Sequence, residues 1–377
     1  MRLGVDGREI QDGVVTGIGR SLANFISYFA GHESTHELIL FAEKSLPIEL
    51  SSRCRELIIP ALPTFYWDQW KLVRHLRENR IDLFYSPYYK LPLLSPIPSI
   101  NQVLDLMYLV FPPYVQDLGV LKRMYYATLG RAFSLKAINI ITDSEHARKD
   151  IVRLWKINPG KITIIPLGVA DRYTPVRDKG ICSKVRKKFN LPERYILYLG
   201  NFKPHKNVVS LVEAFSVIKQ EIKDIKLVLA GPLDAHGQTI QNRVAAAGLS
   251  EDVVFTDVIQ EEDLPEVILS MAELFVFPSL YEGFGIPPLE AMACGTPVVA
   301  SDRTAIPEVV GNAGLLVNPQ NIYKLGQAIL SLLKNQNLHS TYAEKGLKRA
   351  AQFRKEQTAG ELYRHILKLL ITSKNIR

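Results

Sequence analysis

Residues 273–300 read ELFVFPSLYEGFGIPPLEAMACGTPVVA, which is an order of strand, glycine-rich turn, helix and second strand. The apolar runs at 273–277 and 297–300 predict buried strands. Pro287 and Pro288 predict the first turn of a helix, where the missing N–H of proline costs nothing. A unit of this kind is typical of parallel sheets that carry helices on both faces.

The same alternation runs through the whole chain. In the first half, short apolar strands are expected near residues 2–5, 38–41, 56–59, 82–85, 98–104, 138–142 and 162–165, with helices at 18–30, 67–79, 119–136 and 145–155. In the second half, strands are expected near 195–199, 226–230, 252–255, 273–277, 297–300 and 315–317, with helices at 207–220, 238–247, 263–270, 288–294 and 321–334. Two such runs predict an α/β protein of two doubly wound, Rossmann-like domains that face a cleft.

The domain boundary is expected within residues 171–190, which hold Pro175 and the basic cluster 184–188. The N-terminal domain would then span residues 1–172 and the C-terminal domain residues 190–355, with one or two helices in the tail 356–377. A length of 377 residues fits two domains better than one.

Composition narrows the classes of function. The net charge of +8 is spread evenly without a basic tail, which argues against a dedicated nucleic-acid binder and fits an anionic substrate or an acidic membrane surface. The three cysteines are far apart and show no metal-type spacing, which favours a reduced, cytoplasmic setting. The N-terminus reads as a strand rather than a signal peptide, and no apolar run reaches the roughly 18 residues of a membrane span.

Glu282 and Glu290 stand eight positions apart around the glycine-rich turn. Gly283 and Gly285 would let backbone amides face a ligand without hindrance from a Cβ atom, and a helix start attracts anions through its free N–H groups and dipole. The segment therefore offers acceptors for sugar hydroxyls and donors for a phosphate, a combination that suits a nucleotide sugar.

Two other glycine-containing turns follow expected strands. Gly17 and Gly19 lie in Thr16-Gly-Ile-Gly-Arg20, where the third glycine of a dinucleotide fingerprint is replaced by Leu22, so NAD binding is rejected and a plain flexible turn stays the alternative. The turn 200–207 ends in Lys206 and Asn207. Asn207 is expected to cap the next helix, and Lys206 is expected beside a diphosphate, with a solvated lysine as the alternative.

These motifs together resemble the retaining glycosyltransferases of family 4, which have the GT-B fold, and among them the mannosyltransferase-like group 1 enzymes of bacteria that build surface polysaccharides. The family's Glu-x7-Glu motif is matched by Glu282 and Glu290. The resemblance covers nearly the whole chain and is carried by the segments 16–20, 142–150, 165–169, 229–232, 278–301 and 305–319.

The resemblance implies a role for each site residue in the second half. Glu282 would contact the hydroxyls of the transferred sugar, with help from the backbone at Gly283, Phe284 and Gly285. Glu290 would accept hydrogen bonds from the ribose diol.

Other roles are implied in the same way. Lys206 would hold the diphosphate, and Val258 would lie against the base. Gly17 and Gly19 would shape the floor where donor and acceptor meet. The N-terminal domain would bind the acceptor, the C-terminal domain would bind the nucleotide sugar, and the helix within 356–377 would pack back on the N-terminal domain.

The chain departs from the family at two places. Leu104 stands where a histidine is usual, which leaves Asp105 as the polar candidate for a catalytic role, with a loop cap as the alternative. His205 stands where an arginine is frequent before the diphosphate lysine. Because a neutral histidine carries no full charge, weaker diphosphate binding at higher pH is expected.

The chemistry implied is metal-independent hexosyl transfer, because the sequence contains no Asp-x-Asp motif and fixed positive groups would replace the cation. The resemblance implies retention by front-face attack, from GDP-mannose or a UDP-sugar with mannose favoured, onto a saccharide or polyprenyl-linked acceptor, without a cofactor. A catalytically silent, nucleotide-sugar-binding partner subunit is the alternative, motivated by Leu104. An epimerase is disfavoured because no set of acid and base residues is evident.

The segment Phe65–Arg77 combines aromatic and basic residues. An ordinary amphipathic helix and a helix that touches an anionic membrane both fit this pattern. The second interpretation places the protein at the inner face of the cell membrane.

Overall fold

The computed structural model describes residues 1–10, 17–32, 35–48, 50–117 and 119–373. The chain forms two compact units, Met1–Gly168 with Lys355–Arg377, and Val169–Arg354. The segment 171–190, expected to separate the domains, belongs to the second unit. There the Asp178 carboxylate caps helix α8 (Lys179–Lys188) by accepting from the Ile181 N–H, and α8 packs against α11 (Pro265–Met271). The basic cluster is the exposed side of this helix and not a linker.

The first unit is built on a seven-stranded parallel sheet with the order β3-β2-β1-β4-β5-β6-β7. Successive residues of one strand face opposite sides. On β2, for example, Leu38 and Leu40 join one hydrophobic cluster, whereas Ile39 and Phe41 join the other. The strands are β1 (Arg2–Asp6), β2 (Glu37–Ala42), β3 (Cys54–Ile58), β4 (Leu83–Ser86), β5 (Ser99–Gln102), β6 (Asn139–Thr142) and β7 (Ile162–Ile164).

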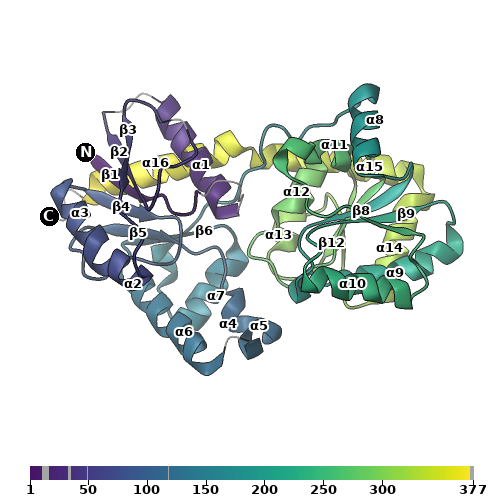
Figure 1. Cartoon of the computed structure of the whole chain (residues 1–377), viewed down its shortest axis with the longest axis horizontal. Helices are drawn as coiled ribbons and strands as arrows, with labels where there is room; N and C mark the ends of the chain where they lie inside the picture. Colours follow the sequence, from purple (N-terminus) through teal and green to yellow (C-terminus); the bar gives the residue numbers. More distant parts are fainter. Residues whose placement is uncertain (11–16, 33–34, 49, 118, 374–377) are drawn as a thin grey trace. The chain divides into compact units, whose positions relative to one another are not determined.

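Helices cover both faces of this sheet. Helix α1 and the C-terminal helix α16 lie side by side on one face (Figure 1) and bury Phe25 and Ile366 in one cluster. The other cluster contains Trp67, Phe133 and Trp155 from the helices of the opposite face. The helices are α1 (Gly17–Gly31), α2 (Thr64–Tyr66), the π-helix η1 (Trp67–Lys71), α3 (Leu72–Glu78), α4 (Met107–Val110), α5 (Pro112–Asp117), α6 (Gly119–Lys136), α7 (Glu145–Trp155), the 3-10 turn η2 (Pro159–Lys161) and α16 (Lys355–Ser373).

The second unit is built on a six-stranded parallel sheet with the order β10-β9-β8-β11-β12-β13. Figure 1 shows α9 and α10 on one face, with α14 packed against α9, and α11 and α12 on the other. The strands are β8 (Tyr195–Leu199), β9 (Lys226–Ala230), β10 (Val253–Phe255), β11 (Leu274–Phe277), β12 (Val298–Ser301) and β13 (Leu315–Val317). The remaining helices and turns are η3 (Pro204–Lys206), α9 (Val208–Glu221), α10 (Ala235–Ala246), η4 (Glu261–Asp263), α12 (Ile286–Ala293), α13 (Ile306–Val310), α14 (Ile322–Lys334), α15 (Gln336–Ala350) and η5 (Ala351–Phe353).

Each expected strand is present, and each expected helix has a counterpart. The expected helix 67–79 begins earlier, at Thr64, and contains the π-helix η1. Helices α8, α13 and α15 and the short helices α4 and α5 were not expected from the sequence. Among the described residues, no helix combines the length and the apolar character that a membrane crossing needs.

The loops after β8 and β9 touch at two glycines, and this contact generates a prediction about folding. A Cβ atom on Gly231 would lie 2.1 Å from the carbonyl oxygen of Gly200, a separation that real Cβ atoms essentially never show. Gly231→Ala should therefore cost roughly 1–3 kcal/mol and lower the melting temperature by roughly 3–9 °C, measured by thermal unfolding.

Gly326→Ala is the matched control in the same unit. Its Cβ would meet only the Ala214 carbonyl oxygen, at an ordinary 3.7 Å, and alanine is the better helix former within α14. A Gly231→Ala protein as stable as this control would contradict the close approach of the two loops.

Candidate functional site

The second sheet changes direction between β8 and β11. From β8 the chain moves to β9 and β10 on one side and then returns to β11 on the other side of β8. In open parallel sheets, ligands bind outside the carboxyl ends of the strands at such a point. The turn after β8 carries Lys206, and the turn after β11 carries Glu282.

Lys206 and Glu282 form an ion pair at this point. The Lys206 Nζ atom donates to the Glu282 Oε1 atom over 2.6 Å, and the two side chains are only 13% and 14% exposed. The Lys206 ammonium also lies over the Phe277 ring, 5.1 Å from its centroid, which adds an attractive cation–π contact. The structure thus brings together two residues that lie 76 positions apart in the chain.

Backbone contacts fix the turns that carry the pair. The Leu280 N–H donates to the His205 carbonyl oxygen over 2.7 Å, and the Glu282 N–H donates to the Thr304 Oγ1 atom over 3.0 Å. These bonds tie the turn after β8 to the turn after β11, and the latter to the loop after β12. Lys206 and Glu282 are therefore held in place from the backbone outward.

Asn207 does not cap helix α9 with its side chain, contrary to expectation. It adopts left-handed backbone angles, with a φ of 55°, and its amide Nδ2 donates to the carbonyl oxygens of Pro278 and Pro319. The side chain therefore links the loops that follow β8, β11 and β13. Tertiary contacts outcompete the local capping bond at this position.

Gly285 stands at the N-cap position of α12 with a φ of 94°, a left-handed angle that side chains rarely adopt. This angle directs the chain from the acidic turn of Glu282 and Gly283 into the helix. Glu290 is buried, at 5% exposure, in the second turn of α12. Phe284 is buried too, and its ring packs edge-on against Phe353.

His205 is buried, at 4% exposure, next to Lys206. Burial, together with the positive charges of Lys206 and Lys203, lowers the pKa of His205 to about 3. The imidazole is therefore neutral throughout the physiological range. The expected weakening of diphosphate binding at higher pH therefore finds no support in the chain without its ligand, where His205 carries no proton to lose, and it stays a prediction.

Val258 lies on the loop after β10, two strands away from β8, and is 44% exposed. It therefore shares the carboxyl edge of the sheet with Lys206 and Glu282.

The other expected residues lie in the first unit. Gly17 opens helix α1, Gly19 is buried within it, and Ile18 lines the same hollow as Leu104 and Asp105. The structure therefore brings the glycine turn and Asp105 together. The Asp105 Oδ1 atom accepts the Met107 N–H over 2.9 Å, so the loop-cap alternative describes part of what this carboxylate does.

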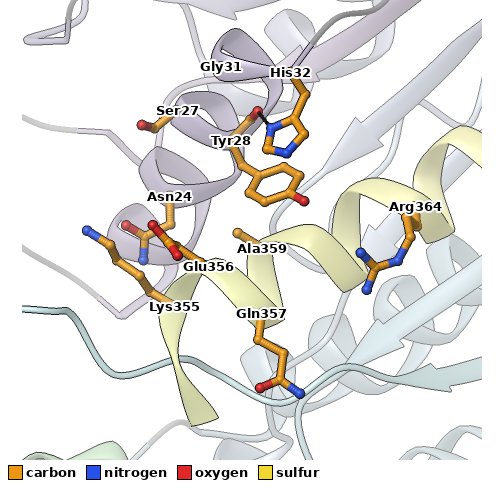
Figure 2. A pocket seen from close by; sticks show the side chains of 10 residues that line it. All are labelled: Asn24, Ser27, Tyr28, Gly31, His32, Lys355, Glu356, Gln357, Ala359 and Arg364. Carbon is orange, nitrogen blue, oxygen red and sulfur yellow. Dashed lines mark hydrogen bonds between the residues drawn. The ribbon is translucent and has the colours of Figure 1, made fainter. Parts of the chain in front are cut away.

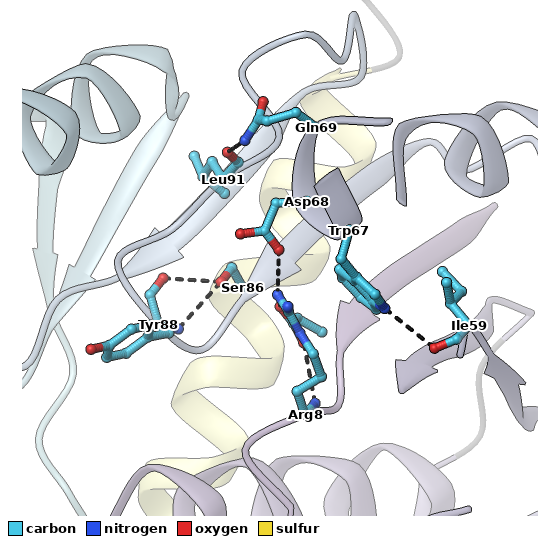
Figure 3. A network of polar contacts seen from close by, with 9 residues as sticks. Arg8, Ile59, Trp67, Asp68, Gln69, Ser86, Tyr88 and Leu91 are labelled. Carbon is cyan, nitrogen blue, oxygen red and sulfur yellow. Dashed lines mark hydrogen bonds and ion pairs between the residues drawn. The ribbon is translucent and has the colours of Figure 1, made fainter. Parts of the chain in front are cut away.

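A buried network of polar contacts holds the loops at the carboxyl edge of the first sheet (Figure 3). The Arg8 guanidinium bonds to the carboxylates of Asp6 and Asp68, over 2.6 and 2.7 Å, and stacks on the Trp67 ring, 3.7 Å from its centroid. Trp67 in turn donates from its indole nitrogen to the Ile59 carbonyl oxygen over 3.3 Å. The loops after β1 and β3 are thereby fixed to the π-helix η1.

A larger hollow, of about 600 Å³, lies between α1 and α16 (Figure 2) and contains none of the expected residues. Tyr28 and His32 stack there with ring centroids 3.8 Å apart. Helix α1 starts at the carboxyl edge of the sheet, so the lining residue Gly31 at its other end approaches the amino edge. This position argues against the hollow as the reaction site.

Sequence reasoning missed several residues around the candidate site. Phe277 beneath Lys206 reads only as a strand residue, and Thr304 reads as an ordinary loop threonine. Neither contact leaves a local signal. The tyrosines that surround Asp105 do leave one, since Tyr85, Tyr88 and Tyr89 are closely spaced at the end of β4.

The chain matches two described families. Residues 15–172 match the family described as Glycosyltransferase Family 4, and residues 183–349 match the family described as Glycosyl transferases group 1. The two matches together span most of the chain. The protein therefore belongs to the group 1 glycosyltransferases of family 4.

The relatives include several bacterial mannosyltransferases. The chain is 34% identical to the O-antigen chain mannosyltransferase B of Escherichia coli over 216 residues, which are 57% of this chain and 56% of that protein. It is 26% identical to the O-antigen chain mannosyltransferase RfbU of Salmonella typhimurium over 77% of this chain and 76% of that protein. The matched region spans about half the length of the first relative and 30% of the mannosyltransferase WbdA of Escherichia coli.

Solved structures confirm the GT-B fold. Sucrose-phosphate synthase from Thermosynechococcus elongatus matches with a TM-score of 0.77 at 23% identity, over 98% of this chain and 99% of that chain. The glycosyltransferase WaaG matches with a TM-score of 0.73 at 16% identity, over 96% and 98%. Anabaena HepE, solved in complex with UDP, matches with a TM-score of 0.76 at 16% identity, over 97% and 99%.

Burial of His205 predicts a loss of stability in acid. The unfolded chain takes up a proton at this side chain below its ordinary pKa of 6.5, whereas the folded chain does so only near pH 3. His205 therefore makes its full contribution to the free energy of unfolding above pH 6.5. This contribution declines as the pH falls and is smaller by about 2–3 kcal/mol at pH 4.5. His205→Gln should flatten the fall in unfolding free energy between pH 7.5 and 4.5, measured by urea unfolding followed by circular dichroism.

His32→Gln, which changes an exposed histidine that is not among the groups acting on His205, is the control and should leave the fall unchanged. Equal pH dependence in the wild type and in His205→Gln would show that the folded protein protonates His205 readily.

Proposed function

We propose that the protein is a metal-independent, retaining hexosyltransferase that moves a sugar, with mannose favoured, from a nucleotide diphosphate sugar to a saccharide or lipid-linked saccharide. The second unit would bind the donor and the first unit the acceptor. The observation that carries the proposal is the Lys206–Glu282 pair at the switch point of the second sheet.

The Lys206–Glu282 pair suits a nucleotide sugar donor because Lys206 matches its diphosphate and Glu282 matches its sugar. The diphosphate of the donor would take Lys206 as its counter-ion, and Glu282 would then be released to accept hydrogen bonds from the sugar hydroxyls. Lys206 exchanges one anionic partner for another, so its charge stays compensated throughout. Charge-assisted hydrogen bonds of this kind are about twice as strong as neutral ones.

The departing diphosphate gains negative charge during transfer. Lys206 and the amino end of α12, including the N–H groups of Phe284 and Gly285, are fixed before the donor arrives, so they could stabilise that charge without reorganisation. These groups would do the work of a metal ion. Glu290 would bind the ribose and Val258 would flank the base.

The nature of the relatives supports mannose. Two of them are named O-antigen chain mannosyltransferases, and a third is an MMP alpha-(1->4)-mannosyltransferase from Mycolicibacterium hassiacum. GDP-mannose is therefore the first donor to test. A UDP-sugar is the second, since the structural neighbour HepE was solved with UDP-glucose.

Donor hydrolysis by the purified chain tests the proposal. GDP-mannose and UDP-glucose should each be assayed for slow release of nucleoside diphosphate. Lys206→Ala should raise the donor KM roughly 10- to 100-fold, because a charged hydrogen bond is lost. Glu282→Ala should lower kcat by about 100-fold or more, because a group that acts on the reacting sugar is lost.

Lys334→Ala is the matched control, because it breaks an exposed pair with Glu221 in the same unit and should leave both constants unchanged. Thermal unfolding shows whether each variant is folded. Hydrolysis unaffected by Glu282→Ala would refute the assignment of the site. Donor binding without any turnover would instead favour the silent partner subunit that Leu104 suggested.

The segment around η1 is the candidate contact with a membrane. Phe65, Tyr66 and Trp70 are 55%, 45% and 49% exposed. The Trp70 ring stacks on Tyr66 and meets Phe65 edge-on. The next turn bears Lys71 and the exposed Arg74. Exposed aromatics beside basic side chains match an anionic lipid surface, which is where a lipid-linked acceptor would be held.

Vesicle sedimentation tests this contact. The protein should bind vesicles rich in phosphatidylglycerol at low salt and dissociate from them at high salt. Replacing both Phe65 and Trp70 by serine should weaken binding about tenfold or more, because each aromatic ring contributes apolar burial. Tyr323→Ser, at a residue 69% exposed in the second unit, is the control. Equal binding by the double variant would exclude this surface.

A further inference from the structure

The first sheet has a switch point of its own, between β1 and β4. The chain runs from β1 to β2 and β3 on one side and resumes with β4 and β5 on the other. A hollow of about 170 Å³ lies where β4 and β5 end, and it is lined by Ile18, Tyr88, Tyr89, Gln102, Asp105 and Tyr108 among others. It therefore occupies the place in the first unit that corresponds to the Lys206–Glu282 pair in the second.

Three tyrosine rings, Tyr88, Tyr89 and Tyr108, line this hollow, and Tyr126 packs against two of them. The centroids of Tyr88 and Tyr89 are 4.4 Å apart, those of Tyr108 and Tyr126 are 4.5 Å apart, and Tyr89 lies 6.0 Å from Tyr126. Tyr88 and Tyr108 are half-buried, so part of each ring faces open space. Aromatic rings offer an apolar face and a polar tip at a low cost in side-chain entropy, which suits a ligand with both apolar and hydroxyl surfaces.

The Tyr108 hydroxyl is the feature that points to a ligand. Its oxygen is shielded from solvent and has no hydrogen-bond partner among the described residues. Burial raises the pKa of Tyr108 and of Tyr88 well above their usual range, so both phenols keep their protons and remain donors. A buried donor without an acceptor costs free energy, and a bound hydroxyl group would remove that cost.

The remaining polar groups are fixed from behind. The Tyr85 hydroxyl donates to the Gln102 Oε1 atom over 2.6 Å, so the amide N–H groups of Gln102 stay available to donate. The Asp105 carboxylate is held by the Met107 N–H. The Ser86 hydroxyl donates to the Tyr88 carbonyl oxygen and accepts from the Tyr88 N–H, as Figure 3 shows. These two bonds fix the turn after β4.

The charge of the hollow selects a class of ligand. Among the described residues its lining contains the Asp105 carboxylate and no lysine or arginine. The Lys90 ammonium lies nearby, 5.8 and 5.9 Å from the ring centroids of Tyr88 and Tyr89, so an anion is disfavoured by the one carboxylate in the lining and has no cation within it to bind. Donors from phenols and an amide, one carboxylate acceptor and aromatic faces instead match a neutral molecule rich in hydroxyl groups. No lysine or arginine of the described residues lines the hollow to hold the diphosphate of a lipid-linked acceptor, so its sugar end is the part that fits.

We infer that this tyrosine-lined hollow binds a pyranose ring of the acceptor saccharide, with Asp105 accepting from its hydroxyls and Tyr88 and Tyr108 donating to them. The inference rests on the proposed function and adds to it the acceptor-binding residues and the neutral character of the sugar they take. Leu104, beside Asp105, contributes an apolar wall to the same hollow.

Binding of methyl α-D-mannopyranoside, a neutral monosaccharide, tests the inference by saturation-transfer NMR and by isothermal titration up to 100 mM. The wild type should bind it, and Tyr108→Phe should weaken binding about 2- to 10-fold, because one neutral hydrogen bond is lost. Tyr125→Phe is the matched control, since Tyr125 is 41% exposed on α6 and does not line the hollow.

Two further measurements separate the possible failures. The melting temperature of Tyr108→Phe should equal or exceed that of the wild type, because no partner is lost; a clear fall would mean that the hydroxyl has a structural role and would overturn the inference. GDP-mannose hydrolysis without acceptor, measured for the wild type and for Tyr125→Phe, shows whether the donor site is intact. If hydrolysis occurs but the sugar does not bind, or binds equally to both variants, the hollow is not the acceptor site. If hydrolysis itself is absent, the proposed function fails instead.

Discussion

The ion pair between Lys206 and Glu282 depends on the pairing of β8 with β11, and the candidate donor site depends on the ion pair. A lysine and a glutamate that lose most of their solvent gain little net stability, because desolvation offsets most of their attraction. The fold nevertheless holds both with backbone bonds from Leu280 and Thr304. So much structural support for a pair of small energetic value indicates that its position matters more than its contribution to stability.

The same constraint explains why a helix start is placed at this point. Pro287 and Pro288 allow α12 to begin at once, and Gly285 supplies the left-handed angle that turns the chain into it. The acidic turn, the left-handed residue and the helix start therefore form one continuous piece of chain beside Lys206. An anion that reached this place would meet a cation and a helix dipole that are already oriented.

The strands could be predicted because parallel strands buried on both faces leave continuous apolar runs, such as Tyr195–Leu199 and Leu274–Phe277. The proximity of Lys206 and Glu282 also follows from sequence, once the turns are placed after strands of a doubly wound sheet. Features that depend on tertiary environment could not be predicted. The burial that keeps His205 neutral leaves no local pattern in the sequence. The same is true of Asn207, whose side chain bonds to the carbonyl oxygens of two distant prolines and does not cap the next helix. Helix α8 was missed because its basic residues, which lie on its exposed face, resemble a linker.

The two switch points differ in chemistry in a way that fits the two partners of a transfer reaction. The edge of the second sheet presents an ammonium group and a helix dipole, which suit a charged diphosphate. The hollow in the first unit presents phenols, an amide and a carboxylate, which suit a neutral polyol, and no lysine or arginine of the described residues lines it to bind a phosphate. The diphosphate of a donor placed in the hollow would be repelled by the Asp105 carboxylate. A neutral acceptor placed at Lys206 carries no charge that could replace Glu282, so the ion pair would stay closed. The two sites would thus sort the two substrates by charge before any contact specific to one sugar is made.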